Sequence, residues 1–197
     1  RVDYAALVVY DVSQPDQPKE IARRHYGWDI ETIYPTDSHL FIGSTRGMYI
    51  LDRSGPAAPV EVGFVEHVRA CDPVVVSGPV AYVTLRGTSG CGQAPDELLC
   101  IDIQNPRAPR VIGKKELSTP YGLTVNYPYL YVSTGQSGYT LVDVARPNLP
   151  NALAAWADWP TRDFIWADST LYVLGLDDLR IFDVGNPKQP VLRSTIQ

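Results

Sequence analysis

The stretch LRIFDVGNPKQP, at positions 179–190, decides the fold, because the same pattern occurs at positions 7–18 as LVVYDVSQPDQP. In each copy a hydrophobic run ends at an aspartate, and prolines follow four and seven residues later. The pattern recurs at Asp11, Asp52, Asp102, Asp143 and Asp183, with the proline pairs Pro15/Pro18, Pro56/Pro59, Pro106/Pro109, Pro147/Pro150 and Pro187/Pro190. Ten of the 17 prolines lie in this register, which predicts tandem copies of one structural unit.

The spacing of the copies identifies the unit. Successive aspartates are 41, 50, 41 and 40 residues apart, and repeats of about 40–45 residues with four short strands are typical of β-propeller blades. A strand that ends in an aromatic residue precedes each of the last four aspartate strands, and these residues are Phe41, Tyr82, Tyr131 and Tyr172. We therefore predict an all-β β-propeller of four-stranded antiparallel blades, with four complete blades and a two-strand half-blade at the N-terminus.

The residue types have a physical reason. Apolar residues occupy both positions before the aspartates, as in Ile181-Phe182, so both faces of that strand should be covered by neighbouring sheets. The aspartate can accept backbone N–H bonds in the following turn. The prolines lack a donor N–H and therefore end the strand.

These motifs resemble the LVIVD repeat family, whose strands follow the type L-x-I-x-D-V-S-x-P-x-x-P. Residues 7–18 and 179–190 match closely, and residues 52–59 and 143–150 match more loosely. The resemblance implies a bacterial propeller, generally exported or associated with the cell surface, and thus an extracytoplasmic location. It implies no common activity and supplies no catalytic residues.

The chain begins in the third strand of a blade and ends in the fourth strand of another. We expect one propeller domain over residues 1–197 that forms part of a longer polypeptide with further blades. Two alternatives remain open: a small ring of five units with one incomplete, and a ring that a second chain completes.

The composition of the chain limits the classes of partner that it is expected to bind. The formal net charge is −5 and lysines and arginines do not cluster, which argues against nucleic acid. No apolar run approaches the ~20 residues of a transmembrane helix. No cofactor motif occurs, so we expect no cofactor and favour a protein partner or further blades.

The chain has three cysteines, and their positions indicate in which cellular compartment it is expected to act. Cys71 begins an inner strand, and Cys91 lies in the glycine-rich insertion GTSGCGQAPD at positions 87–96 of the same blade. We predict a Cys71–Cys91 disulfide, which would imply an oxidising compartment; the alternative is two unpaired thiols in a cytosolic protein. Cys100 occupies an apolar column and is expected to be a buried thiol. A metal site at these cysteines is not expected.

A polar group of residues is predicted at the channel mouth, where the inner strands begin. These positions differ between repeats, unlike the blade core, and the candidates are Trp28, Asp29, Glu31, Arg69, Asp72, Tyr121, Arg162 and Asp163. Propellers commonly bind ligands or partners at such a funnel. The alternative is that these residues are solvated strand ends that neutralise one another.

Two functions compete. The favoured one is a non-catalytic structural or protein-interaction module, with no catalytic residue assigned. The alternative is a small-ligand binder, or a hydrolase or lyase, that uses the funnel, with Asp72 and either Glu31 or Asp163 as acid and base. Trp156 and Trp159, on or after an outer strand, are expected to be exposed enough to contact a protein.

Overall fold

The computed structural model describes residues 6–25, 30–55, 57–67, 73–87, 92 and 95–197. The predicted strand content is confirmed, and every sheet is antiparallel. An N-terminal pair, β1 (Ala6–Asp11) and β2 (Lys19–His25), is followed by four sheets of four strands each. Four complete blades and an N-terminal half-blade are therefore present, as the repeat pattern predicts.

The strands follow one another across each blade in chain order. The first sheet contains β3 (Ile30–Pro35), β4 (His39–Ser44), β5 (Gly47–Asp52) and β6 (Val60–Glu66), and the second β7 (Val74–Ser77), β8 (Val80–Leu85), β9 (Glu97–Asp102) and β10 (Arg110–Glu116). The third contains β11 (Leu123–Asn126), β12 (Tyr129–Ser133), β13 (Tyr139–Asp143) and β14 (Asn151–Trp156), and the fourth β15 (Asp163–Ala167), β16 (Thr170–Leu174), β17 (Leu179–Asp183) and β18 (Val191–Ile196).

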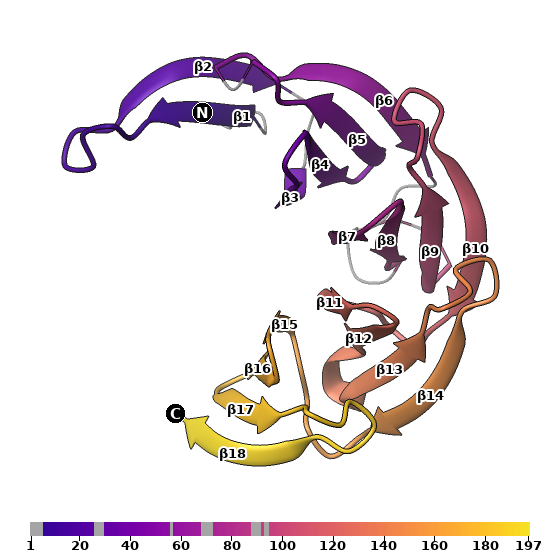
Figure 1. The fold of residues 1–197 in the computed structure, drawn as a ribbon. Coiled ribbons are helices and arrows are strands. Elements are labelled where there is room, and N and C mark those ends of the chain that lie inside the picture. Colours follow the sequence, from indigo (N-terminus) through magenta and orange to yellow (C-terminus); the bar gives the residue numbers. More distant parts are fainter. Residues whose placement is uncertain (1–5, 26–29, 56, 68–72, 88–91, 93–94) are drawn as a thin grey trace.

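The sheets are arranged along an arc (Figure 1). The inner strands β3, β7, β11 and β15 lie nearest the centre of the arc, and β6, β10, β14 and β18 form the outer rim. Apolar clusters fill the space between successive sheets; one of them joins Tyr82 and Cys100 of the second sheet to Leu130 and Val142 of the third. Each sheet buries its faces against its neighbours, because a single short sheet cannot do so alone.

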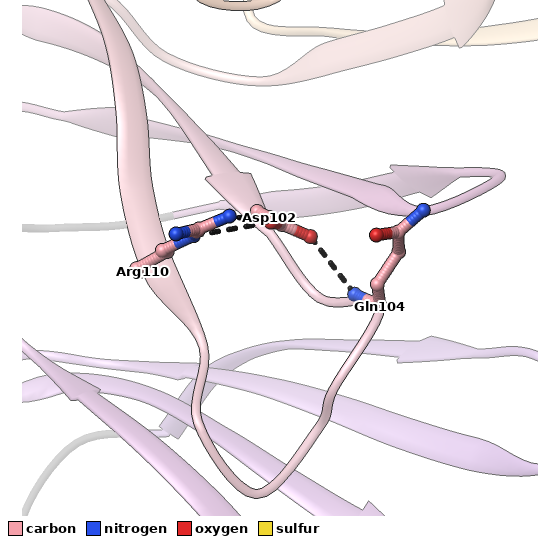
Figure 2. A network of polar contacts seen from close by, with 3 residues as sticks. All are labelled: Asp102, Gln104 and Arg110. Carbon is pink, nitrogen blue, oxygen red and sulfur yellow. Dashed lines mark hydrogen bonds and ion pairs between the residues drawn. The ribbon is translucent and has the colours of Figure 1, made fainter.

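The five anchor aspartates end β1, β5, β9, β13 and β17, and all of them cap the following turn. In each case one carboxylate oxygen accepts the backbone N–H of the residue two positions later, at 2.7–3.0 Å. Figure 2 shows the Asp102 turn, where Gln104 N donates to Oδ1 at 3.0 Å and Arg110 donates to Oδ2 through Nε and Nη2. The predicted capping role is confirmed.

A small residue on the outer strand lets the next blade approach. Gly63, Gly113 and Ala154 pair with Ile50, Cys100 and Leu141, and each pairing adjoins a β-bulge. A side-chain carbon added at Gly63 would overlap the carbonyl oxygen of Pro106 in the next proline turn. Glycine is therefore required at this position by close contact between two backbones.

Candidate functional site

The inner strands enclose an open cavity of about 360 Å³ near the centre of the arc. Its walls come from β3, β7, β11 and β15, and its lining is Thr32, Tyr34, Pro73, Val74, Val75, Leu123, Thr124, Val125, Asp163, Phe164, Ile165 and Trp166. Among these lining residues, Asp163 alone carries a charge. A cavity that exposes both apolar and polar groups can hold a small ligand.

Asp163 lies at the first position of β15. One carboxylate oxygen accepts the Phe164 N–H at 2.8 Å and lies so close to Gly122 that a side-chain carbon at that position would overlap it. Asp163 is exposed to solvent on one side, but on the other side protein atoms exclude water from its carboxyl group. This desolvation raises the pKa of Asp163, and the Phe164 hydrogen bond opposes the rise only in part.

Tyr121 and Arg162 each precede an inner strand, and the structure brings them together. The Arg162 guanidinium carbon lies 5.5 Å from the centroid of the Tyr121 ring. The backbone N–H of Tyr121 donates to Ser133 O at 2.9 Å, and that of Arg162 donates to Leu174 O at 2.7 Å. Both residues are thus fixed at the edge where the inner strand begins.

Two buried hydroxyls join the blades at this edge. Thr84 Oγ1 donates to Tyr121 O at 2.8 Å, and Ser133 Oγ donates to Thr161 O at 2.7 Å. Each hydroxyl comes from the second strand of one blade and binds the segment that leads into the next inner strand. The start of that strand is therefore positioned by the preceding blade.

Arg86 belongs to this group, although it is not among the residues predicted for the funnel. Its guanidinium carbon lies 3.9 Å from the Tyr121 ring centroid, within the range of a cation–π contact. Arg86 lies four residues after the aromatic Tyr82, and the matching positions in the other blades are Thr45, Gly135 and Leu176. This variation between repeats is the same signal that selected Tyr121 and Arg162.

The other predicted funnel residues are distributed differently. Glu31 is exposed on β3. Trp28, Asp29, Arg69 and Asp72 lie outside the described residues, as do both cysteines of the predicted disulfide, Cys71 and Cys91. The funnel and the disulfide therefore remain predictions.

Two further expectations can be compared with the structure. Cys100 is a buried free thiol, as predicted, and burial raises its pKa to about 12, so it is a poor nucleophile. The prediction of exposed Trp156 and Trp159 is wrong, because both are partly buried in the cluster between the third and fourth sheets. Their rings stack on buried Tyr139, with centroids 4.9 and 6.4 Å from its ring.

The described ranges contain no group of three or more His, Cys, Asp or Glu residues arranged to hold a metal ion. Within the same ranges, no helix is long and apolar enough to cross a membrane.

Comparison with known proteins supports the fold. A functionally unknown protein from Desulfotomaculum acetoxidans DSM 771 is 11% identical, with a TM-score of 0.76 over 96% of this chain and 62% of that one. A protein from Lactobacillus plantarum is 12% identical, with a TM-score of 0.73 over 95% and 64%. BamB from Moraxella catarrhalis is 15% identical, with a TM-score of 0.58 over 90% and 52%.

The chain thus spans about half to two thirds of the length of these solved structures. No protein-family model matches it, and no curated protein matches it. At these identities the likeness concerns architecture alone. The blades, their number and these neighbours together establish a β-propeller fold.

Proposed function

We propose that this chain is a non-catalytic β-propeller domain of the LVIVD repeat type, spanning residues 1–197, that acts outside the cytoplasm as a structural or protein-interaction module. Its partner is a protein β-sheet, supplied by a second protein or by further blades of the same polypeptide.

One observation carries this proposal: the fourth sheet exposes an apolar face. Ile165, Tyr172 and Ile181 are paired across β15, β16 and β17, so their side chains lie in one row on one face. Ile165 is 66% exposed, Tyr172 37% and Leu174, on the same face, 50%. Contiguous apolar surface of this kind marks an interaction site.

The contacts between blades indicate what such a face binds. In the third sheet Tyr131 and Leu141, which correspond to Tyr172 and Ile181, are fully buried against the fourth sheet. The Tyr131 hydroxyl donates to Pro187 O in the proline turn of that sheet. A partner sheet with a similar turn would bury the exposed face of the fourth sheet by the same contacts.

Photocrosslinking in the native host tests the proposal. A benzophenone amino acid replaces Tyr172, and a matched control replaces Leu149, which is 61% exposed in a proline turn. We expect a discrete adduct at position 172, which mass spectrometry would map to a β-sheet domain of a partner or to another part of the same polypeptide. Equal crosslinking at both positions would contradict the docking role.

The extracytoplasmic location is tested separately. Peptide mapping of the native protein without reduction should recover Cys71 and Cys91 in one disulfide-linked peptide. Recovery of both as free thiols from unreduced native protein would contradict the oxidising compartment.

The raised pKa of Asp163 in the central cavity favours a second candidate function, a small-ligand binder, hydrolase or lyase with Asp163 as acid or base. Under this alternative, Asp163→Asn would abolish binding or turnover while crosslinking at position 172 would continue. Under the interaction proposal, Asp163→Asn leaves the crosslink unchanged and no activity is lost.

A further inference from the structure

We propose that Arg86, Tyr121 and Arg162 form a binding site for an oxyanion, the carboxylate or phosphate group of a small ligand. The site combines two guanidinium groups around one aromatic ring, both within 6 Å of its centroid. The two guanidinium carbons are therefore separated by no more than the sum of their distances to the ring.

Tyr121 is held in place from several sides. Its ring lies against Gly135, where a side-chain carbon would come within 2.6 Å of Cε2. Gly135 has φ of +62°, a conformation that glycine adopts without strain. The carbonyl of Tyr121 accepts the Thr84 hydroxyl, so the preceding blade fixes the Tyr121 backbone, while the η1 (Gly135–Ser137) turn packs against the ring.

Arg86 brings a buried donor that lacks an acceptor. Its Nε is fully buried and has no hydrogen-bond partner among the described residues. The two oxygens of the Asp96 carboxylate accept the backbone N–H groups of Gly87 and Thr119, and no ion pair in the described part of the chain joins this carboxylate to Arg86. A buried N–H without an acceptor is unfavourable, and an anion that reached the Arg86 Nε through a small movement of the side chain would remove this cost.

Arg162 adds a second positive charge without a counterion in the described part of the chain. The neighbouring Asp163 carboxylate accepts the Phe164 N–H and lies against Gly122, and no ion pair joins it to Arg162. The Arg162 backbone is fixed by its N–H bond to Leu174 O and by the Gly122 N–H that its carbonyl accepts at 3.0 Å. The Arg162 side chain, which carries the positive charge, therefore extends from a backbone that two hydrogen bonds hold in place.

The chemistry of the two side chains sets the class of ligand. A guanidinium stacked on an aromatic ring uses its face for the contact, and its N–H groups point outward in the plane. These groups match the paired oxygens of a carboxylate or phosphate. The protein has a net charge of −5, so two arginines at one tyrosine ring, neither of which forms an ion pair with a described carboxylate, form a local exception that favours an anion.

Titration of the whole chain tests the site. Inorganic phosphate and succinate are added separately at constant ionic strength, and NMR follows the arginine Nε–Hε resonances. We expect saturable shifts of the Arg86 and Arg162 signals with at least one of the two anions, and the stronger binder tells a phosphate ligand from a carboxylate ligand. The absence of saturable shifts with both anions would overturn the proposal.

Variants locate the binding. Arg86→Lys keeps the charge but loses the planar fork, and Arg162→Gln removes the charge; each should weaken binding by about tenfold or more. The control Arg146→Gln, at an exposed arginine in a proline turn, should change it by less than about twofold. Equal weakening by the control would show a nonspecific charge effect and overturn the site. The circular dichroism spectrum verifies that each variant is folded.

Discussion

The third and fourth sheets are built from the same repeat but differ in what covers them. In the sheet of β11–β14, Tyr131 and Leu141 are fully buried, and the Tyr131 ring centroid lies 5.1 Å from that of Trp166 on β15. In the sheet of β15–β18, the matching Tyr172 is 37% exposed and all of β18 is exposed. Burial in this fold is therefore a property of the adjacent blade and cannot be read from the residue alone.

The largest effect should come from the aromatic column. Tyr131→Ala removes a fully buried ring and the hydroxyl that binds Pro187 O, so we expect unfolding to become easier by about 3–5 kcal/mol. Tyr172→Ala should cost only about 1–2 kcal/mol, because its ring is already partly in water. Urea denaturation of both variants measures the difference. Equal costs would mean that the exposed face is covered in solution.

The second largest effect is expected at Gly113, where the backbones of two neighbouring blades touch. Gly113→Ala forces a side-chain carbon onto the Pro147 carbonyl, and we expect a cost of about 1–3 kcal/mol. Ser194 holds the matching position on β18, where it is exposed, so Ser194→Ala should be nearly neutral. Gly55→Ala is the matched control for the glycine change itself, since its nearest neighbour would be 3.9 Å away. Thermal melts compare the three variants.

An effect of comparable size is expected at the Ser133 hydroxyl, which joins two blades. Ser133→Ala removes the donor to Thr161 O and the acceptor of the Gly135 N–H, which should cost about 1–3 kcal/mol. Leu174 occupies the matching position on β16 and is 50% exposed, so Leu174→Ser should cost below about 1 kcal/mol. Hydrogen exchange of the Tyr121 and Arg162 amides would show whether the edge loosens in Ser133→Ala. Unchanged exchange there would contradict the role of Ser133 in positioning this edge.

The smallest expected difference concerns the turn aspartates, which all the blades share. In Asp102 the backbone N–H of Gln104, followed by Arg110, lowers the pKa; in Asp183 the side chain of Arg193, followed by the Gly185 N–H, does the same. Because the folded pKa lies below the unfolded value of about 3.8, the stabilisation is present above that pH and is lost as pH falls through the folded pKa.

Asp102→Asn and Asp183→Asn should therefore each reduce the amount by which stability falls between about pH 5 and pH 2. The two reductions should be similar in size, because each cap depends on local contacts. Melting temperatures across this range measure the effect, and Asp158→Asn, at an exposed aspartate outside the turns, is the control. A much larger change at Asp102 than at Asp183 would show that the neighbouring blade contributes to the cap.

The sequence by itself determined the features that depend on neighbours in the chain. The Asp-x₃-Pro-x₂-Pro register predicted where five strands end, how each turn is capped and how many blades there are, because strand ends and turns are local. The burial of Cys100 was predicted from the apolar residues at the equivalent positions of the other repeats.

Only the tertiary structure decided what depends on the next blade. Trp156 and Trp159 are partly buried because Tyr139 and the fourth sheet come against them, which no local pattern indicates. Arg86 joins Tyr121 and Arg162 although 35 residues separate it from the first and 76 from the second. Packing between sheets brings together residues far apart in the chain, so the alternation of side chains along a strand identifies two faces but not which of them a neighbour will cover.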